Sequence, residues 1–142
     1  AASAGVLSGN VDSHDDGCSF AESFVQEGAD IIMPVAGPVG LGSAAYCKET
    51  GSCMVVGVDV DWTVSAAEYA DVVLTSVLKN VNVAVYDTIK AAVDGTFKGG
   101  VYVGTLKNGG VGLAAVSGAS ADLTAALDKI KADIISGAVS VK

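Results

Sequence analysis

The sequence predicts an α/β fold built on a parallel sheet with helices on both faces. In the first half of the chain, three short apolar runs alternate with two segments of helical pattern. Strands that are separated by helices pair in parallel through right-handed crossovers. The second apolar run, ADIIMPVAG, is almost continuous, which is typical of a strand buried on both faces by flanking helices.

The expected elements of the first half are, in order, strand 4–9, helix 18–28, strand 29–37, helix 38–51 and strand 53–59. The first helix carries Phe20 and Phe24 at helical spacing and ends at Gly28, a residue type that commonly stops a helix. The second helix is opened by Pro38 and closed by Gly51. The polar loop NVDSHDDG before the first helix offers capping side chains.

The second half of the chain is richer in glycine. Its expected elements are an extended run over 70–79, a helix over 82–97, a pair of extended pieces over 99–114 and a helix over 120–137. The dipeptide Asn108-Gly109 predicts a tight turn between the two extended pieces. Ser120 is the expected N-cap of the last helix, in which Leu123 and Leu127 begin an apolar stripe.

The loops that follow the three strands indicate where a ligand binds. In parallel sheets, ligands lie at the carboxyl ends of the strands. DSHDD follows the first expected strand, AGPVG the second and DVDW the third. Asp59 and Asp61, in the last of these loops, are therefore expected to project toward a ligand-binding crevice.

The composition narrows the range of partners. The 142 residues carry 16 acidic and 8 basic side chains, a formal net charge of -8, and every basic side chain is a lysine. Binding to nucleic acid needs a concentrated basic face, and guanine is usually read by arginine. The composition therefore argues against nucleic acid as a partner, and against anionic membrane surfaces for the same reason.

The three cysteines do not form a recognisable metal site. Cys18, Cys47 and Cys53 are too few for a disulfide scaffold and too unevenly spaced for zinc. Cys47 and Cys53 flank a predicted helix end and turn, CKETGSC, and this spacing allows a short-loop disulfide, which would suit an oxidising compartment. Two reduced cysteines are an equally open alternative.

Four sequence blocks carry a family resemblance: GADIIMPVAGPVGLG, GVDVD, VLTSVLKNVNVAVYDTIKAAVDGTFKGG and GGVGLA. In these blocks the chain resembles the basic membrane protein family of ABC-transporter solute-binding lipoproteins, also called purine nucleoside receptor A-like proteins. The resemblance runs in order from about residue 11 to the C-terminus. Four blocks at the expected spacing make it specific.

The resemblance implies a type I periplasmic-binding-protein fold, in which two α/β lobes joined by hinge strands trap a ligand. The chain resembles only the C-terminal half, which implies a missing N-terminal half or a second chain. Residues 1–73 would form most of the second lobe, and 74–142 a hinge crossing, a returning first-lobe helix and the C-terminal segment.

The implied function is capture of a nucleoside or similar small polar ligand for an ABC transporter permease, without chemistry on the ligand and without a cofactor. The implied location is outside the cytoplasm, at the cell surface or in the periplasm. A lipid on the missing N-terminus would anchor the protein to the membrane.

The resemblance also assigns site residues. Family members hold ribose hydroxyls with an acid after the third strand, assisted by a lysine, and the matching residues are Asp59 and Lys79. An ionised carboxylate can accept two hydrogen bonds from a vicinal diol, and an ammonium nearby keeps it ionised. Asp61 is the second candidate acid.

Three more residues complete the predicted site. Gly37 matches a family glycine that lets the ligand approach the backbone. The family's usual GGTG is GPVG here, which removes an amide donor and a hydroxyl. His14 stands where the family commonly has an aromatic residue, and Trp62 is a candidate lid or stacking residue. The alternatives are an exposed histidine and ordinary packing of the indole.

A dinucleotide-binding enzyme domain is the main rival interpretation. AGPVGLG lies between a strand and a helix, and Asp59 follows seventeen residues after Gly42. This layout is similar to a fingerprint in which glycines admit a pyrophosphate and an acid binds the ribose. The order here is G-x-x-G-x-G instead of G-x-G-x-x-G, and no residue downstream suits hydride transfer.

The sequence gives less support to nucleophilic catalysis and to a metal site. A nucleophile paired with histidine would have to use His14, and nothing marks Cys18 as an activated thiol. Asp12, Asp15 and Asp16 lack the spacing of an EF-hand. The sequence therefore predicts a binding protein with no catalytic residues and no metal site.

Overall fold

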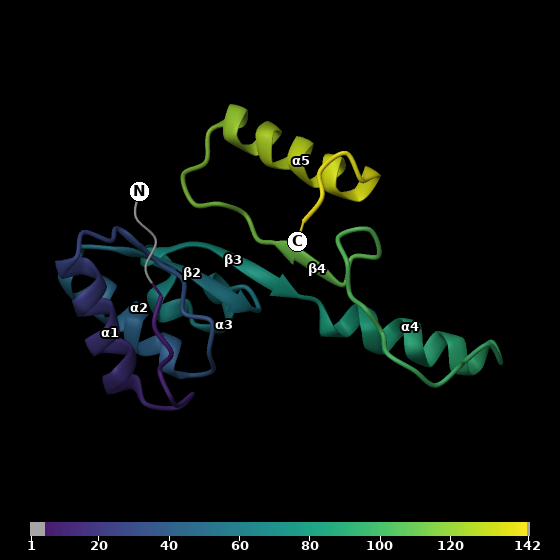
Figure 1. The fold of residues 1–142 in the computed structure, drawn as a ribbon, viewed down its shortest axis with the longest axis horizontal. Coiled ribbons are helices and arrows are strands. Elements are labelled where there is room, and N and C mark those ends of the chain that lie inside the picture. Colours follow the sequence, from purple (N-terminus) through teal and green to yellow (C-terminus); the bar gives the residue numbers. More distant parts are fainter. Residues whose placement is uncertain (1–4, 142) are drawn as a thin grey trace. The chain divides into compact units, whose positions relative to one another are not determined.

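A computed structural model describes residues 5–141 and has the predicted α/β class, with a mostly parallel four-stranded sheet. The elements, in chain order, are α1 (His14–Gln26), β1 (Ile31–Ile32), α2 (Val39–Thr50), β2 (Met54–Asp59), α3 (Trp62–Ser65), the 3-10 helix η1 (Ala67–Val72), β3 (Val73–Lys79), α4 (Val81–Val93), β4 (Val111–Leu113) and α5 (Ala121–Ser136) (Figure 1). The hydrogen-bonded strand order is β1-β2-β3-β4. The contacts divide the chain into a first unit that ends at Val77 and a second that begins at Leu78.

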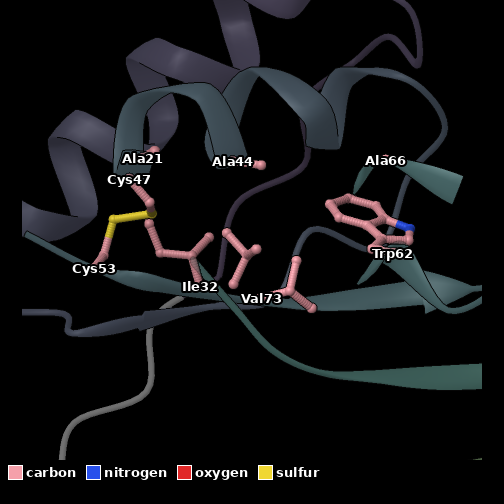
Figure 2. Close-up of a cluster of buried hydrophobic side chains, with 9 residues drawn as sticks. Ala21, Ile32, Ala44, Cys47, Cys53, Trp62, Ala66 and Val73 are labelled. Atoms are coloured by element: carbon pink, nitrogen blue, oxygen red, sulfur yellow. A yellow bond between two sulfur atoms is a disulfide. The ribbon is translucent and has the colours of Figure 1, made fainter. Parts of the chain in front are cut away.

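The core of the first unit is small and lies between α2 and the strands. Figure 2 shows its side chains, most of which come from α1, α2, α3 and the strands β1, β2 and β3. Val55 of β2 and Val73 of β3 are completely buried. β1 and β2 pair in parallel, with Ile31 opposite Met54 and Ile32 opposite Val55. The carboxyl ends of these two strands therefore lie at the same edge of the sheet.

The helix α1 begins four residues before its predicted start, at His14. Ser13 is its N-cap: the Ser13 hydroxyl accepts a hydrogen bond from the backbone N–H of Asp16 at 3.2 Å. Asp15 and Asp16 lie in the first turn, where negative charge interacts favourably with the helix dipole. The second part of the predicted capping loop, from His14 onward, is therefore the first turn of α1.

The helices α1 and α2 cross with their backbones in contact. A Cβ atom on Gly42 would lie 1.9 Å from the carbonyl oxygen of His14, and one on Gly17 would lie 1.9 Å from that of Val39. The hydroxyl of Ser43, which is buried, donates a hydrogen bond to the carbonyl oxygen of Gly17 at 2.8 Å. Only glycine fits at both crossing positions.

The predicted first strand, 4–9, was wrong over the residues that the structure describes. Residues 5–9 form no strand, and residue 4 lies outside the described part of the chain. The apolar side chains of this run are not packed: Leu7 is 95% exposed. A strand needs a hydrogen-bonded neighbour, and β1, the first strand in the sheet order, pairs only with β2.

Cys47 and Cys53 form a disulfide, which settles the alternative that the sequence left open. It joins the last turn of α2 to the residue before β2, with both cysteines buried (Figure 2). Cys18 is a free, partly buried thiol.

We expect removal of this disulfide, by Cys47→Ala with Cys53→Ala, to lower the free energy of unfolding by about 2 kcal/mol, because the short cross-link restricts the unfolded chain. Urea denaturation followed by the fluorescence of Trp62, the sole tryptophan, measures the change. Cys18→Ser is the control. Equal midpoints for the double variant and the parent would contradict the prediction.

The second unit contains α4, β4 and α5. Ser120 is the N-cap of α5, as predicted, with its hydroxyl accepting from the N–H of Leu123 at 3.1 Å. Of the two extended pieces predicted over 99–114, only β4 is a strand. The predicted turn at Asn108 is present, and the Asn108 side chain crosses it by accepting from the N–H groups of Thr105 at 2.7 Å and Gly110 at 3.0 Å.

The helices α4 and α5 contain no buried residue in the described structure. Ile89 of α4 is 59% exposed and Ile130 of α5 is 51% exposed. The Tyr102 hydroxyl donates to the carboxylate of Asp87 at 2.9 Å, and this hydrogen bond raises the pKa of Tyr102. Within residues 5–141, every helix is too short or too polar to cross a lipid bilayer.

Candidate functional site

The candidate site in the first unit lies at the carboxyl ends of β1 and β2. The loop after β1 leads through Gly37, which is exposed, into α2. The N–H of Val39 donates to the carbonyl oxygen of Val11 at 2.8 Å, so the loop before α1 is joined to the start of α2. Val11 directly precedes the predicted DSHDD loop, and Val39 belongs to the predicted AGPVG loop. These two parts of the predicted rim are therefore close together, although residues 5–9 form no strand.

Asp59 ends β2 and has an unusual backbone conformation. Its φ angle is 68°, and it is the one non-glycine residue with positive φ among those the structure describes. The left-handed conformation disfavours side chains by about 1–2 kcal/mol, and less for aspartate and asparagine. The Asp59 side chain is exposed, and the N–H of Val60 bonds to the carbonyl oxygen of Val58 at 2.8 Å. Strained residues of this kind concentrate at functional sites.

Asp61 has a structural role. It is the N-cap of α3, and its Oδ1 atom accepts from the N–H of Thr63 at 3.0 Å and from the Thr63 hydroxyl at 2.7 Å. One carboxylate oxygen is thus occupied by the start of the helix. Asp59 differs from Asp61 in its backbone, which has a positive φ angle.

Trp62 packs into the core instead of lying open at the rim as a lid. Its side chain is only 6% exposed, and its Nε1–H donates to the carbonyl oxygen of Val58 at 3.0 Å. The ring lies against two glycines, because a Cβ on Gly57 would be 2.6 Å from Cγ of Trp62 and one on Gly40 would be 2.9 Å from Cη2. The indole ring therefore packs between β2 and the start of α2 (Figure 2).

The remaining predicted residues lie at element ends. His14 is the first residue of α1 and is exposed. Lys79 is the last residue of β3 and belongs to the second unit, whereas the other five predicted residues belong to the first. Among the residues from 5 to 141, no cluster of histidine, cysteine, aspartate and glutamate side chains forms a metal site.

Ser76, which was not predicted to matter, is completely buried in β3. Its hydroxyl oxygen accepts a hydrogen bond from the backbone N–H of Trp62 at 3.1 Å. The available signal was a pair of polar residues, Thr75 and Ser76, inside an otherwise apolar strand. Buried polar groups in strands are usually hydrogen-bonded to something specific.

The glycines of AGPVGLG do not form a dinucleotide site. A Cβ on Gly40 would meet Trp62 and Pro34 within 3.0 Å, and Gly42 is in contact with the backbone of α1. In a dinucleotide fingerprint the equivalent glycines face a pyrophosphate. Here the space beside both glycines is filled by the chain itself.

Comparison with known proteins identifies the family of this chain. Residues 6–142 match the family described as "ABC transporter substrate-binding protein PnrA-like". The chain belongs to this family. The family, by its description, consists of substrate-binding proteins and not of enzymes, so the dinucleotide-enzyme alternative is not favoured.

Individual proteins are similar to this PnrA-like chain as well. The chain is 32% identical to the ABC transporter nucleoside-binding protein BmpA of Lactococcus lactis subsp. cremoris, over 88% of this chain and 39% of that protein. It is 36% identical to a lipoprotein of Pyrococcus abyssi, over 68% of this chain and 24% of that protein. The chain thus spans well under half the length of these relatives.

A solved structure supports the fold of this PnrA-like chain. A crystal structure of ABC transporter system solute-binding proteins from Aeropyrum pernix K1 superposes with a TM-score of 0.78. The sequence identity is 24%, and the match covers 96% of this chain and 46% of that chain. The α/β fold expected from the sequence is therefore shared with about half of a known solute-binding protein chain.

Proposed function

We propose that this chain is part of a solute-binding protein that captures a nucleoside, and that Asp59 binds the ribose hydroxyls. The observation that carries the proposal is the left-handed backbone of Asp59 at the exposed carboxyl end of β2. A carboxylate held at that position accepts two hydroxyl hydrogen bonds, and charge-assisted hydrogen bonds are the strong ones. The name of the Lactococcus lactis relative, a nucleoside-binding protein, supports the ligand class.

The charge of the first unit favours an uncharged ligand. Lys48 is the sole basic residue of the sequence before Lys79, and it forms a 3.3 Å ion pair with Asp71 on η1. A phosphate near Asp59 would therefore meet repulsion from the acidic residues of the first unit. An uncharged nucleoside therefore suits the acidic first unit better than a nucleotide does.

Three other predicted residues belong to the proposed site, and the support for each is different. Gly37 is exposed beside the start of α2, where a ligand can approach the backbone. His14 is exposed at the start of α1. Lys79 is proposed as a ligand-binding residue on the family resemblance alone.

We propose that the partners are an ABC transporter permease and the remainder of the binding protein. On this proposal residues 1–73 form most of one lobe, and 74–142 form a hinge crossing, a helix of the other lobe and the C-terminal segment. The exposed apolar side chains of α4 and α5 support a further packing partner for the second unit.

The proposed location is outside the cytoplasm, with a lipid anchor. Two observations support it: the Pyrococcus abyssi relative is named a lipoprotein, and the chain contains a buried disulfide. Disulfides persist mainly in oxidising compartments.

Calorimetric titration of the natural full-length protein tests the function. We expect inosine, guanosine or adenosine to bind with micromolar affinity or better, and inosine 5′-monophosphate to bind at least about tenfold more weakly than inosine because of the acidic surroundings. Ribose and hypoxanthine are the controls for each half of the ligand. The 142-residue chain alone is expected to bind inosine more weakly than the full-length protein. Absence of binding by every nucleoside would refute the proposed ligand class.

A further inference from the structure

Two hydrogen bonds from Trp62 close the segment that contains Asp59. The backbone N–H of Trp62 donates to the buried Ser76 hydroxyl at 3.1 Å, and the ring Nε1–H donates to the carbonyl oxygen of Val58 at 3.0 Å. Val58 precedes Asp59 and Trp62 follows it by three residues. Asp59 therefore lies in a short segment whose two ends, Val58 and Trp62, are joined by the hydrogen bond from the Trp62 ring.

The indole ring has little freedom to move. Cγ of Trp62 lies over Gly57 of β2, and Cη2 lies against Gly40 at the start of α2. The Ser76 hydroxyl lies beside Gly57 as well, 2.5 Å from the position a Cβ would take. A ring fitted between two glycines and tied at its nitrogen fixes the path of the chain between β2 and α3.

Asp59 lies in the middle of this segment with a φ angle of 68°. Local preference disfavours that angle for a residue with a side chain, so the surrounding structure has to impose it. On the far side of the segment, the capping bonds from Asp61 to Thr63 fix the start of α3. The N–H of Val60 bonds to the carbonyl oxygen of Val58 at 2.8 Å and closes a three-residue turn around Asp59. Trp62 and Ser76 hold this turn in place, because the Trp62 ring bonds to the same carbonyl oxygen and the Trp62 backbone bonds to Ser76.

We propose that Trp62 and Ser76 are positioning residues that hold Asp59 in the left-handed conformation, with its carboxylate pre-organised for the hydroxyls of a ligand. Neither residue touches the ligand. The ligand-binding part of this proposal rests on the function proposed above for Asp59. Pre-organisation raises affinity because the bound geometry does not have to be selected at the moment of binding.

The first test measures the backbone of Asp59 directly, without a ligand. NMR carbon shifts and the coupling between its amide and α protons report φ in the natural full-length protein. Trp62→Phe keeps a ring between the glycines but removes the Nε1–H donor, and Ser76→Ala removes the buried acceptor. We expect Asp59 to leave the left-handed region in a measurable fraction of molecules in both variants. Ser65→Ala, an exposed serine of α3, is the control and should keep the parent values.

The second test uses two ligands that differ by one hydroxyl, inosine and 2′-deoxyinosine. In the parent, we expect 2′-deoxyinosine to have the larger dissociation constant. We expect the ratio of the 2′-deoxyinosine constant to the inosine constant to fall by about tenfold in Ser76→Ala, because a misplaced carboxylate gains less from the second hydroxyl. A purely structural role would lower the folded fraction and weaken both ligands equally, which leaves the ratio unchanged.

The outcomes separate this proposal from the proposed function. A left-handed Asp59 in both variants, or an unchanged ratio in Ser76→Ala, overturns the positioning role. If the parent protein binds no nucleoside, the nucleoside function fails, and the NMR measurement alone decides whether Trp62 and Ser76 position Asp59.

Discussion

Gly42→Ala is expected to lower the free energy of unfolding of the first unit by about 3 kcal/mol or more, which is a large fraction of the stability of a small domain. The new methyl group would lie 1.9 Å from the carbonyl oxygen of His14 and 2.8 Å from its carbonyl carbon. Both atoms belong to the α1 backbone, so no side-chain rotation relieves the clash. The helices would have to separate, which would also break the 2.8 Å bond from Ser43 to Gly17.

Urea denaturation of this chain, followed by Trp62 fluorescence, measures that loss. Gly5→Ala is the matched control, because a Cβ at Gly5 meets nothing within 4 Å and the residue lies in the same unit. A Gly42→Ala midpoint equal to that of the parent would mean that α1 and α2 do not cross with their backbones in contact.

Asp59→Asn is expected to weaken inosine binding by about 100-fold or more, since two charge-assisted hydrogen bonds to the ribose would be lost. Asparagine tolerates the left-handed conformation almost as well as aspartate, so the fold should be unaffected. Asp59→Gly should lose binding to the same extent while the turn keeps its backbone conformation, because glycine adopts positive φ without strain.

Asp61→Asn supplies the matched control for that experiment. Asparagine is also a good N-cap, so α3 should keep its start, and inosine affinity should stay close to that of the parent. Calorimetry on the natural full-length protein measures all three variants. Parent-like affinity in Asp59→Asn, or a larger loss in Asp61→Asn, would remove Asp59 from the proposed site.

Local signals located α1, α2, α4, α5 and the end of β2, but they gave no sign of α3 and η1. Ser13 and Ser120 cap the helices that follow them because a side-chain oxygen near a free N–H group acts within one turn of chain. Gly51 and Gly137 end two helices in the left-handed conformation for an equally local reason. The run CMVVGVD was predicted as a strand over 53–59, and β2 spans Met54–Asp59.

Strand length needed the tertiary structure. The apolar run over 29–37 predicted a long strand, but β1 contains only Ile31 and Ile32. A strand extends only as far as a neighbour pairs with it, and β1 pairs with β2 alone. The run over 4–9 was predicted as a strand from its apolar side chains alone. Residues 5–9 form no strand because no neighbouring strand pairs with them.

The sequence by itself determined the α/β class, the order of the helices, the family resemblance and the position of the candidate acid, because alternation, capping and motif spacing are readable along the chain. The tertiary structure decided the use of particular residues. Gly42 spaces two helices, Trp62 packs beside Gly57, and Cys47 bonds to Cys53. Each of these depends on which backbone or side chain comes within contact in the folded chain, and the sequence pattern does not specify those contacts.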